Sequence, residues 1–184
     1  MRPRLLQVMA ALSLLLILGC GSAPTIPTVK ALDIERFMGD WYVIASIPTV
    51  FEKNAFNAVE SYRRDEDGTV ETTFRFNKGG FDGPAKVYQS RAFVLDQESN
   101  AHWGMQFVWP FKAEYRVVFL AEDYSLTMIG RSKRDYVWIM ARAPSIPDAD
   151  YAKLLDLLKS YDYDTRLVQK VPQQIDGRPS GGGD

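Results

Sequence analysis

The chain has 184 residues, of which 46% are hydrophobic and 12% aromatic, and this composition excludes intrinsic disorder for most of its length. Its formal net charge of -1 and the lack of a basic stripe exclude a binder of nucleic acid that depends on phosphate contacts. With one cysteine and one histidine it cannot build a metal site from those ligands, so we expect no metal and no cofactor.

Residues 1–19 have the layout of an export signal. Arg2 and Arg4 give a positive start, and 5–18 form an apolar stretch too short for a membrane span of about 20 residues. The stretch runs into Leu18-Gly19-Cys20, which resembles the lipobox of bacterial lipoproteins, where cleavage precedes a cysteine that becomes lipidated. The alternative is an ordinary secretory peptide with a cysteine there by chance. We expect a lipoprotein signal peptide over 1–19 and lipidation of Cys20.

An acylated Cys20 would anchor the protein, because several acyl chains on one residue exceed the two signals that stable membrane attachment needs. Gly21, in place of aspartate, resembles the pattern for sorting to the outer membrane. We therefore expect a lipid-anchored protein of the cell outer membrane, on its periplasmic face. Residues 20–32 contain Pro24 and Pro27 among small residues and predict an extended tether.

The main domain is expected over 33–171. Residues 32–37 predict one helical turn with Asp33 as N-cap. The first strand is expected over 41–47, and it is introduced by Gly39-Asp40-Trp41, where glycine allows a tight start and tryptophan supplies a large core side chain. Both faces of this strand are apolar, so another element must cover its outer face.

Seven further segments alternate apolar and polar residues, are separated by turn residues, and predict antiparallel strands in meander order. They cover 58–64, 69–76, 87–95, 103–109, 114–120, 125–130 and 136–142. An amphipathic helix over 151–161, capped by Asp148 or Asp150, follows them. A short last strand is expected within 165–171, and 172–184 predict a disordered tail.

Eight antiparallel strands and one helix can form an open meander, a sandwich or a closed barrel. Closure removes the exposed edges, and an eight-stranded barrel has room inside for side chains or for one small ligand. We therefore expect an all-β fold, an eight-stranded antiparallel up-and-down β-barrel with the C-terminal α-helix packed outside against the first strand.

Three segments resemble the conserved blocks of the lipocalin family: Gly39-Asp40-Trp41, Ala121-Glu122-Asp123-Tyr124, and Arg142 at the end of the last strand. With the lipobox, they make the chain resemble a bacterial outer-membrane lipocalin of the Blc type from about residue 37 to residue 171. The resemblance implies a calyx closed at one end, where the arginine packs across the tryptophan. It gives Gly39, Trp41, Asp123 and Arg142 structural roles.

The resemblance also implies a hydrophobic or amphipathic ligand in the calyx, of the fatty acid or lysophospholipid class, that the protein binds, stores or carries. Side chains in phase with Trp41 are the candidates for the lining, although one bulge would invert a whole strand. The candidates are Val43, Ala45, Tyr88, Trp103, Met105, Phe107, Trp109, Tyr115, Val117, Trp138 and Met140. The alternative is a structural or interaction lipoprotein whose barrel these side chains fill, without a ligand.

We expect no catalytic residues. His102 stands beside a turn, and Gly79-Gly80 lacks the lysine and the following helix of a phosphate-binding loop. An enzyme is a third alternative, because some lipocalins isomerise their ligands, but no nucleophile–base pair is present. The expected partners are a small hydrophobic ligand and the membrane, with a homodimer left open and no nucleic acid.

Overall fold

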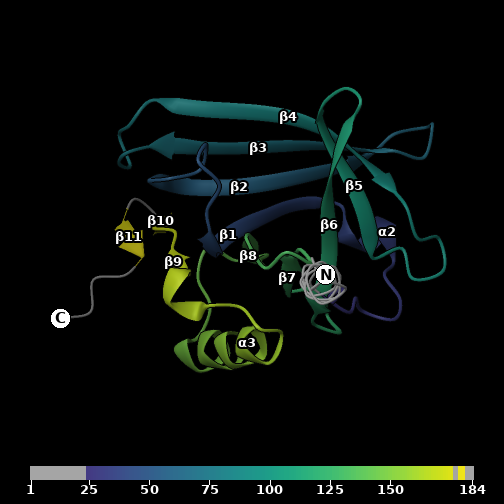
Figure 1. Ribbon diagram of the computed structural model, residues 1–184. Coiled ribbons are helices and arrows are strands. Elements are labelled where there is room, and N and C mark those ends of the chain that lie inside the picture. The colour runs from purple at the N-terminus through teal and green to yellow at the C-terminus, as the bar shows by residue number, and fades with distance from the viewer. Residues whose placement is uncertain (1–23, 176–177, 181–184) are drawn as a thin grey trace, which may run out of the picture.

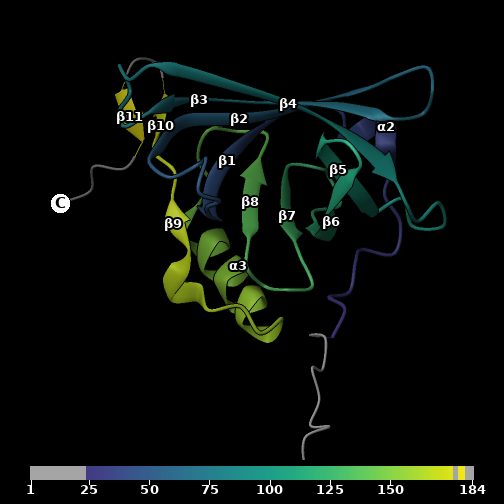
Figure 2. The same cartoon turned by 45° about the horizontal axis from the view of Figure 1, so that its top comes forward.

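The computed structural model describes residues 24–175 and 178–180, so the expected signal peptide and Cys20 lie outside the described residues. The described part is a barrel, and a helix of 13 residues lies beside it (Figures 1 and 2). Its strands are β1 (Gly39–Ile47), β2 (Ala55–Arg64), β3 (Val70–Lys78), β4 (Ala85–Val94), β5 (His102–Val108), β6 (Phe111–Leu120), β7 (Leu126–Gly130) and β8 (Val137–Ala141).

Each strand pairs antiparallel with the next, and β1 pairs with both β8 and β2, which closes the sheet. The expected eight-stranded up-and-down barrel is confirmed. The largest differences in strand bounds are at β6, which begins at Phe111 although 114 was expected, and at β2, which begins at Ala55 although 58 was expected. A bulge between Phe56 and Val59, with Asn57 at φ 51°, interrupts the alternation there, so this part of the strand was assigned to a loop.

The helix α3 (Asp148–Ser160) packs outside the barrel, as expected, and buries Leu154 and Leu158 in a cluster with side chains of β1, β7 and β8. The expected capping by Asp148 or Asp150 is wrong, because Pro147 is the N-cap and no side chain caps the helix. Both aspartates lie in the first turn instead, where their charge is favourable at the positive end of the helix dipole. At the other end of the chain's folded part, Asp33 does cap the short helix α2 (Ile34–Phe37), accepting hydrogen bonds from two backbone N–H groups.

A bulge in β1 decides which residues face the interior. Trp41 and Val43 belong to the cluster inside the barrel, whereas Ala45 belongs to the outer cluster under α3. The pairing of β1 with β8 shifts between Val43 and Ala45, so the strand reverses its faces at this point. The prediction that Ala45 shares the inward face of Trp41 was therefore wrong.

The C-terminal segment closes a seam between β1 and β2. These strands pair only from Gly39 to Tyr42, and further along β1 pairs with the short β9 (Gln169–Lys170), which follows a 3-10 turn, Thr165–Leu167. Gln173 is 2% exposed, and its side-chain amide donates to the Val43 carbonyl at 2.8 Å and to the Ala58 carbonyl at 3.0 Å.

The tail was expected to be disordered from residue 172, and this was wrong for its described part. Gln173–Ile175 (β10) pairs with Arg178–Ser180 (β11) as a small separate sheet. The composition of the tail does not predict this order. The Gln173 side chain is held by backbone carbonyl groups of two distant strands, which need a hydrogen-bond donor. No helix among the described residues has the length and apolar character to cross a bilayer.

Replacing Gln173 tests the seam. Gln173→Ala leaves the carbonyls of Val43 and Ala58 buried without this donor, so the free energy of unfolding in urea should fall by about 1–3 kcal/mol. The matched control is Gln97→Ala, at an exposed loop position, which should change stability by less than about 0.5 kcal/mol. Equal stability of the two variants would contradict a role of Gln173 in closing the barrel.

Candidate ligand-binding cavity

One cation seals the closed end of the barrel. The Arg142 guanidinium lies 3.9 Å from the centre of the Trp41 ring, a cation–π contact, and Gly39 beside it has φ 91°, a backbone conformation that favours glycine. The same guanidinium donates to four backbone carbonyls, those of Arg36, Phe37, Met38 and Asp40. Arginine and tryptophan therefore meet as the resemblance implied.

The turn around Asp123, between β6 and β7, also lies at this closed end. Asp123 accepts hydrogen bonds from the backbone N–H and the hydroxyl of Ser125, and these bonds hold the pKa of Asp123 below its usual value. The neighbouring Tyr124 accepts from the backbone N–H of Asp33, and its ring lies 4.0 Å from the Arg36 guanidinium. The turn thus fastens the β6–β7 connection to α2.

Aromatic side chains fill the closed half of the barrel above Arg142. We call this group the floor cluster; its rings lie 5.0 to 6.4 Å apart between centres and belong to Phe37, Trp41, Tyr62, Trp103 and Tyr115. The hydroxyls of Tyr62 and Tyr115 hydrogen bond to each other in the interior, where burial raises the pKa of both well above the usual range. The closed half is therefore filled by packed aromatic side chains.

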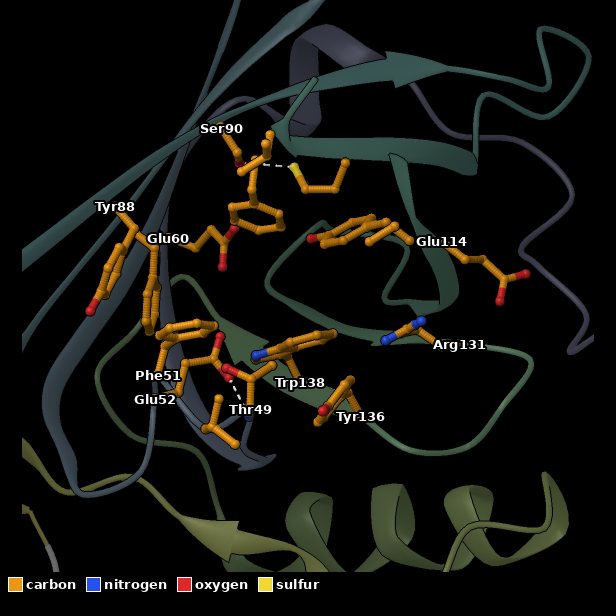
Figure 3. Close-up of a pocket in the computed structure, with 17 residues that line it drawn as sticks. Thr49, Phe51, Glu52, Glu60, Tyr88, Ser90, Glu114, Arg131, Tyr136 and Trp138 are labelled. Carbon is orange, nitrogen blue, oxygen red and sulfur yellow. Dashed lines mark hydrogen bonds between the residues drawn. The ribbon is translucent and has the colours of Figure 1, made fainter. Parts of the chain in front are cut away.

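The open half of the barrel is hollow. A cavity of about 450 Å³ lies above the floor cluster and is bounded by the β1–β2 loop and by strands of both walls (Figure 3). Its lining consists of Thr49, Val50, Phe51, Glu52, Glu60, Phe74, Tyr88, Ser90, Met105, Phe107, Val108, Ala113, Glu114, Tyr115, Arg131, Tyr136 and Trp138.

The expected lining residues divide into three groups. Five of them lie at the cavity: Tyr88, Met105, Phe107, Tyr115 and Trp138. Four lie in the packed core, where filling rather than lining is their observed role: Val43, Trp103, Val117 and Met140. The remaining two are Ala45, in the outer cluster, and Trp109, which is 82% exposed between β5 and β6. Trp109 is displaced from the wall because β5 ends at Val108.

Two carboxyl groups project into the cavity, Glu60 from β2 and Glu52 from the β1–β2 loop (Figure 3). Burial away from water, and then the charge of Glu52, raise the pKa of Glu60 to about 8. Burial also raises the pKa of Glu52, although its carboxylate accepts a hydrogen bond of 2.8 Å from the Thr49 backbone N–H. Among the described residues, neither carboxyl forms a salt bridge.

Arg131 brings the opposite charge to the rim of the cavity. One guanidinium nitrogen lies 3.3 Å from the Asp135 carboxylate, while its Nε is buried without a hydrogen-bond partner. Glu114, the third lining carboxylate, is occupied by Arg116 at 2.6 Å and by two hydrogen bonds from Ser132. The rim thus offers one carboxyl group without a salt bridge, that of Glu52, and one guanidinium with an unpaired Nε, that of Arg131.

Sequence reasoning missed Glu52, Glu60 and Arg131. Glu60 stands between Ala58 and Tyr62 on the inward face of β2, and this parity was the one signal that could have identified it. Charged residues in a strand normally face water, so the signal was passed over. Glu52 and Arg131 lie in loops, where no alternation of residues predicts which way a side chain points. His102, the one histidine, does not line the cavity and lies near Arg116.

The sequence matches the family model of the lipocalin-like domain over residues 32–173. The chain is a member of the lipocalin family. It is 30% identical over 154 residues to temperature-induced lipocalin-1 of Arabidopsis thaliana, covering 79% of this chain and 81% of that protein. It is 30% identical over 177 residues to the outer membrane lipoprotein Blc of Citrobacter freundii, covering 92% of this chain and 98% of that protein.

The fold of this lipocalin agrees with solved structures as well. The crystal structure of the cockroach allergen Per a 4 superposes with a TM-score of 0.62 at 19% identity, covering 83% of this chain and 96% of that one. At such low identity the likeness concerns the barrel and its outer helix, and it leaves the ligand to be argued from the cavity.

The raised pKa of Glu60 makes stability depend on pH. The pKa of Glu60 in the folded protein is about 8, whereas an unfolded glutamate has its ordinary pKa of about 4.5. Between these values the folded state binds more protons, so stability should fall as pH rises, by at most about 1.4 kcal/mol per pH unit for this group.

Urea unfolding at several pH values between about 5 and about 8 measures this slope. Glu60→Gln, which keeps the shape and removes the titration, should flatten it, with the remaining slope in the same direction due to Glu52. The control is Glu98→Gln at an exposed loop position. If Glu60→Gln keeps the full slope, the carboxyl is not held in the desolvated interior.

Proposed function

We propose that this lipocalin binds one amphipathic lipid, of the fatty acid or lysophospholipid class, with the acyl chain inside the cavity. The observation that carries the proposal is the hollow of about 450 Å³ above a solid floor. Ligand sites of about 300–1,000 Å³ with apolar and aromatic walls and a few polar groups are typical of small-molecule binding. The filled closed half alone would fit the alternative of a barrel without ligand, but the open half does not.

Binding rather than catalysis is the inferred activity. Among the described residues that line the cavity there is no histidine or cysteine, and the Ser90 hydroxyl donates to the Met105 sulfur at 3.1 Å rather than to a base. A lining of this kind holds a ligand without activating a nucleophile. Membership of the lipocalin family supports a hydrophobic ligand.

Charges along the cavity favour a zwitterionic head group over a free carboxylate. With a pKa of about 8, Glu60 is mostly protonated at neutral pH, so the depth of the cavity is uncharged and suits an acyl chain. At the rim, Glu52 is complementary to an ammonium group and Arg131 to a phosphate. A fatty acid would place its own carboxylate beside Glu52, so we favour a lysophospholipid.

Anchoring through Cys20 is the second part of the proposal. The lipobox Leu18-Gly19-Cys20 supports it, and so does the similarity to outer membrane lipoprotein Blc over 98% of that protein's length. We infer that the acylated chain is held at the periplasmic face of the outer membrane. A carrier tethered there would exchange lipids with the leaflet that holds it.

Calorimetry with lysophosphatidylcholine, kept below the concentration at which it forms micelles, tests the cavity. Ala113→Phe places a ring in the cavity and should weaken binding by about tenfold or more, which corresponds to about 1.4 kcal/mol. Ala152→Phe, on the exposed face of α3, is the matched control and should bind as the unaltered protein does. Equal affinity of both variants, or no binding at micromolar lipid, would contradict the proposal.

The choice of head group has a separate test with a fatty acid of the same chain length. We expect the lysophospholipid to bind more tightly, and the difference to shrink in Glu52→Gln because the repelling charge is removed. Raising the pH above about 8 ionises Glu60 and should weaken binding of either lipid, an effect that Glu60→Gln should abolish. A fatty acid that binds as tightly as the lysophospholipid at neutral pH would refute the preference.

Acylation is tested by growing cells that express the full chain with a labelled fatty acid. The protein should carry the label, and Cys20→Ser should remove it, because the thiol is the site of lipid attachment. Ser22→Ala, two residues away, should keep the label. A labelled Cys20→Ser variant, or an unlabelled natural chain, would show that the anchor is elsewhere or absent.

A further inference from the structure

Large apolar side chains are exposed around the open end of the barrel. They are 38% to 82% exposed and form what we call the mouth patch: Val50, Phe51, Val87, Tyr88, Phe107, Val108, Trp109 and Phe111. Over the rest of 24–175, the large apolar side chains with comparable exposure are Leu95 and Leu167. A concentration of exposed apolar side chains marks a contact with another molecule or with a membrane.

The mouth patch belongs to segments that meet at one end of the barrel. The β1–β2 loop follows Ile47, which pairs with Val137 at the start of β8, and β4 begins near the same end, where Ala85 pairs with Asn77. The β5–β6 hairpin contributes the most exposed members, and its connecting loop stands at the upper edge of the molecule in Figure 1, away from α3.

The chemistry of the patch fits a lipid surface. Trp109 and Phe111 are 82% and 76% exposed at the tip of a hairpin, and tryptophan prefers the interface between head groups and acyl chains. Two exposed lysines accompany the patch without a salt bridge among the described residues, Lys53 and Lys86. Lysines beside a bilayer are attracted to anionic head groups. The β3–β4 loop contributes one exposed residue of the opposite charge, Asp82.

The N-terminal segment independently reaches the same end. Residues 24–32 form no helix or strand, and they are packed on the barrel: Ile26 is fully buried, and the Val29 backbone N–H donates to the Val117 carbonyl at 2.9 Å. The Pro24 carbonyl accepts a hydrogen bond from Arg134, which lies in the turn between β7 and β8. That turn joins Gly130 to Val137, so it belongs to the open end.

The length of chain before Pro24 limits where an anchor can be. Cys20 precedes Pro24 by four residues, which span at most about 14 Å when fully extended. An acylated Cys20 would therefore hold the bilayer close to the rim of the open end. An anchor attached at the closed end would instead have turned the mouth patch toward water.

We propose that the open end of the barrel docks on a lipid bilayer, with the mouth patch at the interface and the cavity opening toward the membrane. The argument from chain length rests on the proposed acylation of Cys20, whereas the argument from the exposed side chains does not. Docking would let a lipid pass between leaflet and cavity without exposing its acyl chain to water. It would also explain why large apolar side chains are exposed at this end.

Trp109 serves as the reporter of docking. The acylated full chain is reconstituted on vesicles of phosphatidylethanolamine and phosphatidylglycerol whose acyl chains carry bromine, which quenches nearby tryptophan fluorescence. Trp41 and Trp103 are buried, Trp138 lies inside the cavity, and all three remain in Trp109→Phe, so the difference between the natural chain and this variant isolates the signal of Trp109. We expect strong quenching in the natural chain and the loss of most of it in Trp109→Phe.

Leu95 supplies the matched control, because it is 51% exposed in the loop after β4, at the opposite end from the hairpin. Leu95→Trp, made together with Trp109→Phe, should not restore the quenching. Docking is overturned if Trp109→Phe is quenched as much as the natural chain, or if the tryptophan at 95 is quenched as strongly as Trp109. It is also overturned if the protein fails to sediment with the vesicles. The proposed function does not fail with it, because lysophospholipid binding in solution tests the cavity separately.

Discussion

The contact between Arg142 and Trp41 is the interaction on which the rest of the barrel depends. A single guanidinium covers the indole ring and satisfies four carbonyls that α2 and the start of β1 would otherwise leave without donors. These carbonyls meet where β1 and β8 lie side by side at the closed end. With that end sealed, the floor cluster can pack as a solid core, and the open half is free to remain hollow.

A hollow half explains the unusual charges inside. Glu60 loses water in this apolar interior and lies near the charge of Glu52, and both effects raise its pKa to about 8. A charged group there would weaken both folding and the binding of an acyl chain, so protonation reconciles the glutamate with an apolar interior. At the rim, where Glu52 and Arg131 lie, charge can meet a polar head group.

The sequence predicted the barrel well because alternation and turn residues are local signals that survive in every strand. It failed where a single residue changes the phase: the bulge before Ala45 moved that side chain outside, and the early end of β5 left Trp109 in solvent. It also failed where a segment is ordered by contacts with residues far away in the sequence. The Gln173 side chain, for example, donates hydrogen bonds to backbone carbonyls of two strands, β1 and β2. Residues that line the cavity could not be distinguished by type from residues that fill the core, because both are large and apolar. What separates them is their position along the barrel axis, in the open half or in the closed half.

The central claim, that an acyl chain occupies the space above the floor cluster, is tested most directly by nuclear Overhauser contacts to methionine methyl groups. Met105 lines the cavity, whereas Met128 is fully buried in the outer cluster under α3, so the protein contains its own control. With protonated lysophosphatidylcholine and a deuterated protein carrying labelled methionine methyls, the account predicts contacts from the acyl chain to Met105 and none to Met128. Contacts to Met128 without contacts to Met105 would place the lipid outside the barrel and contradict it.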